Sequence, residues 1–301
     1  MTTSGQPDSA SPAVPFAVAT LGIALFSGMD AVMKHLALAL GAYNALIWRT
    51  MAGALFGGAV VLATRAPWPS RAVLRLHLVR GTLSALMALL FFWGLARVPL
   101  AQGVALAFVA PLIALYLAAL VLKEKIERRA IWASLLGFAG VLVIMAGQAQ
   151  AALGREALWG SASILGSAGL YAYNIILMRQ LAQVAKPVEI AFFMSLIVTL
   201  WFALAAPWLA IVPPLSEWPA IAGAAALAFA SLMLLSWAYA RAEAQYLAPV
   251  EYTSFIWAAT FGILVFAEPV RPLTIFGAAM IVGACIFAAG RTRVADANSG
   301  V

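Results

Sequence analysis

Residues 91–126 read FFWGLARVPLAQGVALAFVAPLIALYLAALVLKEKI, a largely apolar segment with charged residues toward each end. Ala96-Arg97 precedes the apolar run, and Glu124 follows the arginine by 27 positions (97 to 124). Ala240-Arg241 and Glu268 repeat this arrangement at the same separation (241 to 268). The recurrence indicates that the chain arose by duplication, and duplicated halves are common in secondary transporters. Transport is therefore the leading hypothesis.

The composition indicates a membrane protein. Hydrophobic residues make up 65% of the 301 positions, charged residues make up 10%, and the mean hydropathy is +1.00. Soluble domains average about half apolar and about a quarter charged residues. Because each spanning helix needs about 20 apolar residues, ten spans occupy about two thirds of the chain. We therefore expect short loops and no separate soluble domain.

Apolar runs separated by Pro, Gly and charged clusters predict ten transmembrane helices. An even number of spans places both termini on one side of the membrane. Twelve Lys and Arg residues fall in the loops and tail on that side, against three in the opposite loops. This bias predicts that both termini are cytoplasmic. The expected spans are 15–38, 43–63, 74–95, 100–122, 130–148, 158–178, 188–210, 218–239, 245–266 and 273–290.

Five spans per half imply that the second half enters the membrane from the opposite side. Such inverted repeats give a carrier two near-equivalent conformations, one open to each side. We therefore expect an all-α integral membrane protein with ten transmembrane helices in two inverted five-helix repeats around a central cavity. The expected repeats cover 15–150 and 151–290, with a disordered cytoplasmic tail at 1–14 and a second cytoplasmic tail at 291–301.

The chain resembles the EamA-type members of the drug/metabolite transporter superfamily, which have ten helices in two repeats. The resemblance implies a carrier of the bacterial inner membrane whose spans 1, 3, 4, 6, 8 and 9 surround the cavity, while spans 5 and 10 pack at the periphery. Within the superfamily, the chain is similar to bacterial amino-acid and metabolite exporters, including the aromatic amino-acid exporter. The residues that carry the resemblance are Trp48-Arg49, 91–126, 240–245, 266–269 and the glycines Gly137, Gly140, Gly147, Gly277, Gly283 and Gly290.

Placing a charged residue inside a spanning helix costs free energy, so such residues are candidates for a structural or functional role. Asp30 and Lys34 are four residues apart on one face of the first span, so they can neutralise each other. Arg49 lies at a similar depth in the second span. These residues either meet a zwitterionic solute or form a salt-bridge set that joins the first two spans.

A second charged group lies nearer the cytoplasm. Glu251 in span 9 and Arg80 in span 3 lie at comparable depth, so they can form an ion pair across the cavity. Glu251 is the best candidate for a proton-coupling carboxylate, because membrane burial tunes such groups for proton exchange. A fixed bridge to Arg80 is the alternative.

Aromatic residues in the middle of the cavity spans predict a pocket for flat or apolar solutes. Packing against neighbouring helices or lipid is the alternative for each. Pro111 and Pro249 interrupt backbone hydrogen bonding in spans 4 and 9, and they are candidate hinges. The glycines of spans 5 and 10 predict close helix contacts. The pocket candidates are Phe92, Trp93, Phe108, Tyr171, Tyr173, Asn174, Trp237, Tyr239, Tyr252, Phe255 and Trp257.

The sequence predicts no cofactor and no metal site, because Cys285 is the only cysteine and His35 and His77 are far apart. Nucleotide-binding and hydrolase motifs are absent, so a solute gradient or a coupled ion such as the proton is expected to drive movement. The net charge of +7 reflects topology rather than a nucleic-acid partner.

The expected function is export of small metabolites, in particular amino acids with aromatic or other apolar side chains. Uptake of a larger metabolite such as S-adenosylmethionine or riboflavin is the main alternative. An intramembrane enzyme and a non-transporting membrane subunit are further alternatives. The expected partners are a small-molecule substrate and the lipid bilayer, and the sequence contains no indication of oligomeric state.

Overall fold

The computed structural model describes residues 13–65, 68–122, 128–150, 154–239, 241, 247 and 250–289, which form helices and turns without a strand. The predicted all-α fold is confirmed. The first half contains α1 (Ala13–Leu40), α2 (Ala42–Ala63), α3 (Arg71–Leu95), α4 (Leu100–Ala107), α5 (Ala110–Leu122) and α6 (Arg128–Gln150). The second half contains α7 (Gly154–Ala182), α8 (Pro187–Leu209), the short helix η1 (Leu215–Glu217), α9 (Trp218–Tyr239), α11 (Ser254–Phe266) and α12 (Pro272–Ala289).

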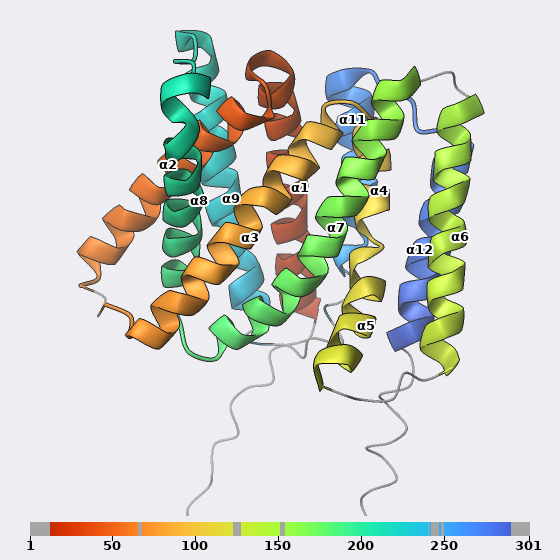
Figure 1. Cartoon of the computed structure of the whole chain (residues 1–301), viewed down its shortest axis with the longest axis horizontal. Helices are drawn as coiled ribbons and strands as arrows, with labels where there is room; N and C mark the ends of the chain where they lie inside the picture. The colour runs from red at the N-terminus through yellow and green to blue at the C-terminus, as the bar shows by residue number, and fades with distance from the viewer. Residues whose placement is uncertain are drawn as a thin grey trace, which may run out of the picture.

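The helices run side by side in one bundle (Figure 1). In the described part of the chain, 6 helices are long and apolar enough to cross a membrane, and they lie within α1, α2, α3, α7, α8 and η1–α9. Shorter apolar helices lie at the other predicted span positions. A helix satisfies its backbone N–H and C=O groups internally, which lipid requires of any spanning segment.

The ends of the helices follow local backbone chemistry. Gly41 has a φ of 81° and separates α1 from α2, a conformation that glycine adopts without strain. The Ser70 side chain accepts a hydrogen bond from Val73 N and caps α3. Pro187 occupies the first turn of α8, where its missing N–H costs nothing.

The two halves pack against each other in matching pairs. α1 packs on α9 and α3 packs on α7, so the first helix of each half meets the third helix of the other. α2 packs on α8, and α6 packs on α12. α1 also contacts α11, and α7 contacts α5. A twofold relation between the halves produces this exchange of partners, as the predicted inverted repeat requires.

Two predicted spans are not continuous helices. The sequence predicts spans over 100–122 and 245–266 with candidate hinges at Pro111 and Pro249, and the structure has turns at 108–109 and 252–253. Pro111 favours the first break, because it has no N–H to donate to the carbonyl four residues earlier. The structure thus places a turn next to the candidate hinge Pro111, whereas Pro249 lies outside the described residues.

The two breaks are equivalent positions of the repeat. They lie 144 positions apart (108 to 252), as do Arg97 and Arg241. Their backbone bonding also matches, because the Val109 carbonyl accepts from the third and fourth residues after it, and the Thr253 carbonyl does the same. A break that recurs in both halves is a feature of the repeated fold rather than a local defect.

α6 and α12 cross at a pair of glycines. A Cβ placed on Gly140 would lie 2.7 Å from the Gly277 carbonyl oxygen, and one on Gly277 would lie 2.6 Å from the Gly140 carbonyl oxygen. Ile281 and Ile144 close the crossing in the same reciprocal way. The predicted close helix contact is confirmed at these two glycines.

The bundle has two ends. α1 begins and α12 ends at the lower end in Figure 1, whereas α3 and α11 end at the upper end, where α4 begins. The positive-inside pattern predicts that the lower end faces the cytoplasm.

Candidate functional site

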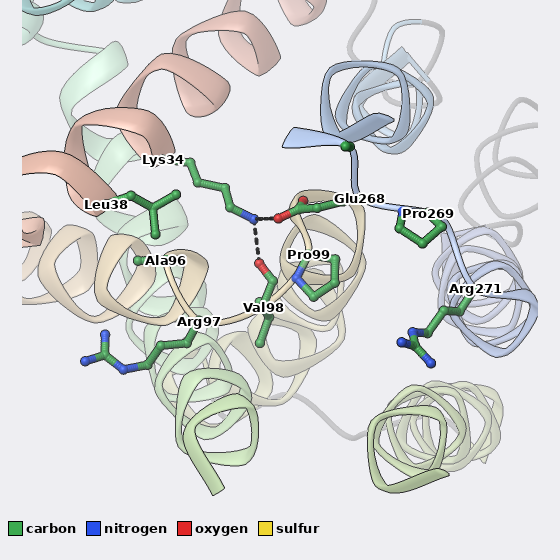
Figure 2. A pocket seen from close by; sticks show the side chains of 10 residues that line it. Lys34, Leu38, Ala96, Arg97, Val98, Pro99, Glu268, Pro269 and Arg271 are labelled. Atoms are coloured by element: carbon green, nitrogen blue, oxygen red, sulfur yellow. Dashed lines mark hydrogen bonds and ion pairs between the residues drawn. The ribbon is translucent and has the colours of Figure 1, made fainter. Parts of the chain in front are cut away.

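A buried ion pair joins the two halves at the upper end of the bundle. Lys34 Nζ, on α1, lies 2.5 Å from Glu268 Oε1, in the loop between α11 and α12 (Figure 2). The Lys34 side chain is only 2% exposed and that of Glu268 is 24% exposed. Lys34 Nζ also donates to the Val98 carbonyl at 2.7 Å. One ammonium group therefore connects α1, the loop before α4 and the loop before α12.

Glu268 is positioned by its own backbone. Ala267 has a left-handed φ of 52° where α11 ends, and Glu268 N donates to the Gly262 carbonyl at 2.9 Å. Glu268 Oε2 accepts a hydrogen bond of 2.8 Å from Leu100 N, at the first residue of α4. Negative charge is favourable at a helix N-terminus. Glu268 thus neutralises Lys34 and caps α4 with its two carboxylate oxygens.

A pocket of about 340 Å³ surrounds this pair at the upper end. Arg97 and Arg271 add positive charge to its wall (Figure 2). The Arg97 guanidinium lies 3.5 Å from the Trp93 ring centroid and pairs with Glu156 at 2.9 Å. The pocket is therefore a basic recess at the end of the bundle. Its lining residues are Lys34, Leu38, Ala96, Arg97, Val98, Pro99, Ala267, Glu268, Pro269 and Arg271.

Asp30 does not neutralise Lys34, which corrects the expectation from their spacing. Asp30 is 6% exposed and lies within electrostatic range of Arg49 on α2. The long Lys34 side chain reaches the loops at the upper end, whereas the short Asp30 carboxylate stays one turn lower beside α2. Arg49 Nε is buried, and no residue that the structure describes forms a hydrogen bond with it. The structure thus places Asp30 and Arg49 within electrostatic range of each other, without an ion pair within 4 Å between them.

Arg80, Tyr171 and Glu251 come together nearer the lower end. Arg80 on α3 is 7% exposed, and Tyr171 on α7 lies within electrostatic range of both Arg80 and Glu251. Among the described residues, the buried Arg80 Nε and Nη1 have no hydrogen-bond partner, so neither atom forms the predicted bridge to Glu251. One turn above Arg80, Ser84 Oγ donates to Asn174 Oδ1 at 3.5 Å. These polar groups follow the contact between α3 and α7.

The aromatic candidates separate into packing groups. Phe108 and Tyr252 contact each other, with ring centroids 5.4 Å apart. Phe92 is 5% exposed within the largest apolar core. Trp93 and Trp237 each lie beside an arginine at equivalent positions of the repeat, with Arg97 3.5 Å and Arg241 4.2 Å from the ring centroids.

The remaining candidates are more scattered. Tyr173 is 40% exposed. Phe255 and Trp257 are partly buried against separate apolar clusters. The Tyr239 side chain and Pro249 lie outside the part of the chain that the structure describes.

Sequence reasoning missed the partner of Lys34. Glu268 was recognisable only as one end of the repeated Arg–Glu spacing, and that repeat is the signal that could have identified it. A second pair that was missed joins His77 Nε2 and Glu189 Oε1 at 3.0 Å, nearer the lower end. Across the described residues, no three His, Cys, Asp or Glu side chains gather as a metal ion would require.

Two segments of the chain, residues 15–146 and 158–290, match the EamA-like transporter family. The protein belongs to this family, and it is a multi-pass membrane transporter. The two matched segments correspond to the two halves that exchange helix partners in the bundle. The family name describes a transporter rather than an enzyme.

Named relatives are similar along much of their length. The pseudopaline exporter CntI of Pseudomonas aeruginosa is 29% identical over 280 residues, 92% of this chain and 95% of the relative. A riboflavin transporter of Brucella anthropi is 29% identical over 220 residues, 70% of this chain and 75% of the relative. One solved crystal structure shares the fold, with a TM-score of 0.61 at 19% identity, covering 94% of this chain and 100% of that chain.

Proposed function

We propose that this protein is a secondary transporter of the bacterial inner membrane that exports small metabolites by alternating access. Its proposed substrates are amino acids with aromatic or other apolar side chains. The observation that carries the proposal is the Lys34–Glu268 pair, which closes the upper end by joining elements of both halves.

The pair suits a reversible gate. The Lys34–Glu268 pair and the bond from Leu100 N to Glu268 connect α1 and α4 of the first half to a loop of the second half. Their loss leaves every helix intact, because none of these bonds lies within a helix. Buried ion pairs are favourable only when well formed, so small displacements switch them between held and released states. The upper end is then the proposed outer gate.

The polar groups below the gate support an amino-acid substrate. Asp30 and Arg49 offer opposite charges within one buried region, and Phe108 and Tyr252 supply aromatic surface between the two halves. A zwitterion with an apolar side chain matches both features. Similarity to an exporter supports the direction.

Riboflavin or another larger metabolite is the second candidate substrate, taken up rather than exported. Similarity to riboflavin transporters favours it. A large flat solute would also suit aromatic surfaces.

Flux into proteoliposomes tests the proposal. Purified protein is reconstituted and assayed with labelled tryptophan, phenylalanine, leucine and riboflavin, with and without a pH gradient. We expect saturable flux of the amino acids. Flux of riboflavin alone would select the second candidate, and no flux of any solute by folded protein would contradict transport of these classes.

The gate is tested by access to a buried cysteine. Val98 is 3% exposed, so Val98→Cys in a Cys285→Ala background should react slowly with a water-soluble thiol reagent. Glu268→Gln should accelerate labelling at least about tenfold, because a neutral amide holds Lys34 less firmly. Glu156→Gln, which removes the exposed acid paired with Arg97 at the same end, is the matched control and should leave the rate unchanged. Equal labelling rates in all three proteins would contradict the proposed gate.

Proton coupling is part of the same proposal. We expect an imposed pH gradient to drive amino-acid accumulation and Glu251→Gln to abolish that drive. Flux that does not depend on the pH gradient would contradict proton coupling and indicate facilitated diffusion.

A further inference from the structure

Arg80 lies inside a predicted span, and among the residues that the structure describes no ion pair balances its charge. It lies nine residues into α3 (71 to 80), about 14 Å from the start of the helix at 1.5 Å per residue. The side chain is 7% exposed, and Nε and Nη1 have no hydrogen-bond partner. A snorkelling arginine would carry its guanidinium group to water instead of burying these atoms. Arg80 therefore needs a different explanation.

The other intramembrane cations differ in this respect. Lys34 is held by Glu268 and by the Val98 carbonyl. Arg49 lies within electrostatic range of the Asp30 carboxylate. For Arg80, the titratable neighbour within range is Tyr171, whose phenol is neutral at physiological pH. Glu251 acts on Tyr171 and forms no hydrogen bond with Arg80 Nε or Nη1. Among the described residues, the group beside Arg80 can therefore donate a hydrogen bond but brings no charge.

The groups around Arg80 form one polar strip between α3 and α7. Ser84 and Asn174 pair one turn above it, and both are buried. Tyr171 lies within electrostatic range of Arg80 and is 38% exposed, so part of its ring is left for a ligand to contact.

Comparison of the two halves indicates that the fold does not require an arginine at position 80. At the interval of 144 positions, its counterpart in the second half is Ala224, on α9 (80 to 224). The counterpart of Asn174 is Asp30 (30 to 174). The twofold fold therefore forms without an arginine at this position, so packing alone does not require one.

We propose that Arg80, Tyr171 and Asn174 form the subsite that binds the carboxylate group of the transported metabolite. The planar guanidinium fork matches the two oxygens of a carboxylate. The Tyr171 hydroxyl and the Asn174 amide add neutral donors beside it. One uncompensated positive charge matches a monoanion, whereas a dianion such as phosphate would bring an unpaired negative charge into the bundle. This assignment deepens the proposed transport function and rests on it.

Thermal unfolding of the purified protein in detergent tests the subsite without any transport measurement. The probes are indole-3-propionate, the neutral indole-3-propionamide and inorganic phosphate. In the wild type, indole-3-propionate should raise the unfolding midpoint at a concentration at least about tenfold lower than the amide needs. Phosphate should leave the midpoint unchanged. Equal action of carboxylate and amide on the wild type, or an equal effect of phosphate, overturns the assignment.

Variants separate binding from a structural role. In Arg80→Gln, the tenfold preference for the carboxylate should fall to less than about twofold, while the midpoint without ligand stays equal or rises, because an unpaired charge has been removed. Arg75→Gln changes an exposed arginine on the same helix and should keep the preference. Retention of the preference in Arg80→Gln overturns the subsite, as does a lowered midpoint in that variant without ligand.

Flux data distinguish the two proposals. Carboxylate preference without flux of any amino acid would contradict the proposed function and leave the subsite standing. Amino-acid flux that the corresponding carboxamides inhibit equally well would sustain the function and overturn the subsite.

Discussion

Phe108 and Tyr252 are equivalent residues of the two halves, 144 positions apart (108 to 252), and their rings meet edge to face with centroids 5.4 Å apart. Each residue lies at the break of its own helix. The two broken helices therefore meet at the place where the repeat maps one half onto the other. When the two halves exchange conformations, the twofold relation maps the contact between Phe108 and Tyr252 onto itself. The contact can therefore persist in both states.

A double-mutant cycle tests this contact. We expect Phe108→Ala and Tyr252→Ala each to lower the unfolding midpoint and the double variant to lower it by less than the sum. An edge-to-face aromatic pair contributes about 0.5–1.5 kcal/mol beyond buried area, and that is the expected coupling energy. The cycle of Phe108→Ala with Tyr43→Ala is the control, because Tyr43 contacts Phe202 instead. Strict additivity for Phe108 and Tyr252 would disprove the coupling.

The Lys34–Glu268 pair should behave as a unit in stability measurements. Lys34→Met alone leaves a carboxylate at the end of the bundle without its partner, and such losses cost about 3–5 kcal/mol when fully buried. We expect a value near the lower limit, since Glu268 is 24% exposed. Lys34→Met combined with Glu268→Gln should recover most of the loss.

Denaturant unfolding of the purified variants measures this effect. The exposed Arg97–Glu156 pair is the control, and Arg97→Met should cost no more than about 1 kcal/mol from loss of the ion pair. A double variant at Lys34 and Glu268 that is no more stable than Lys34→Met would show that the two charges do not depend on each other.

The crossing of α6 and α12 should tolerate no side chain at its centre. Gly140→Ala places a Cβ 2.7 Å from the Gly277 carbonyl oxygen, so the helices must separate. We expect a loss of about 1–3 kcal/mol, as for other overpacked sites. Gly283→Ala on α12 is the control, because a Cβ there meets nothing within 4 Å. Unchanged thermal stability of Gly140→Ala would contradict the crossing.

The orientation of the bundle can be measured by cysteine labelling of intact cells. With Cys285 replaced by alanine, Arg155→Cys should react with a membrane-impermeant thiol reagent, because it lies in the first turn of α7 at the upper end. Lys186→Cys should react only after the cells are opened. Both positions are exposed. The reverse pattern would place the termini outside and overturn the positive-inside assignment.

Much of the fold could be predicted from the local chemistry of the sequence. Apolar length and Pro, Gly and charged punctuation were enough to predict the helical positions, because a spanning segment must satisfy its backbone internally. The repeated Arg–Glu spacing was enough to predict the duplicated halves. Pro111 pointed to an interrupted span, yet it did not reveal that the break falls at Phe108 and recurs at Tyr252.

The pairing of charges depended on tertiary structure. From spacing alone, Lys34 has Asp30 as its natural partner, because residues four apart share a helix face. In the folded protein Lys34 pairs with Glu268, 234 positions away, and Arg80 forms no ion pair among the residues that the structure describes. Periodicity describes which face a residue occupies, whereas the partner across a helix contact follows from how the two inverted halves pack. That packing is a relation between distant segments, and no local pattern records it.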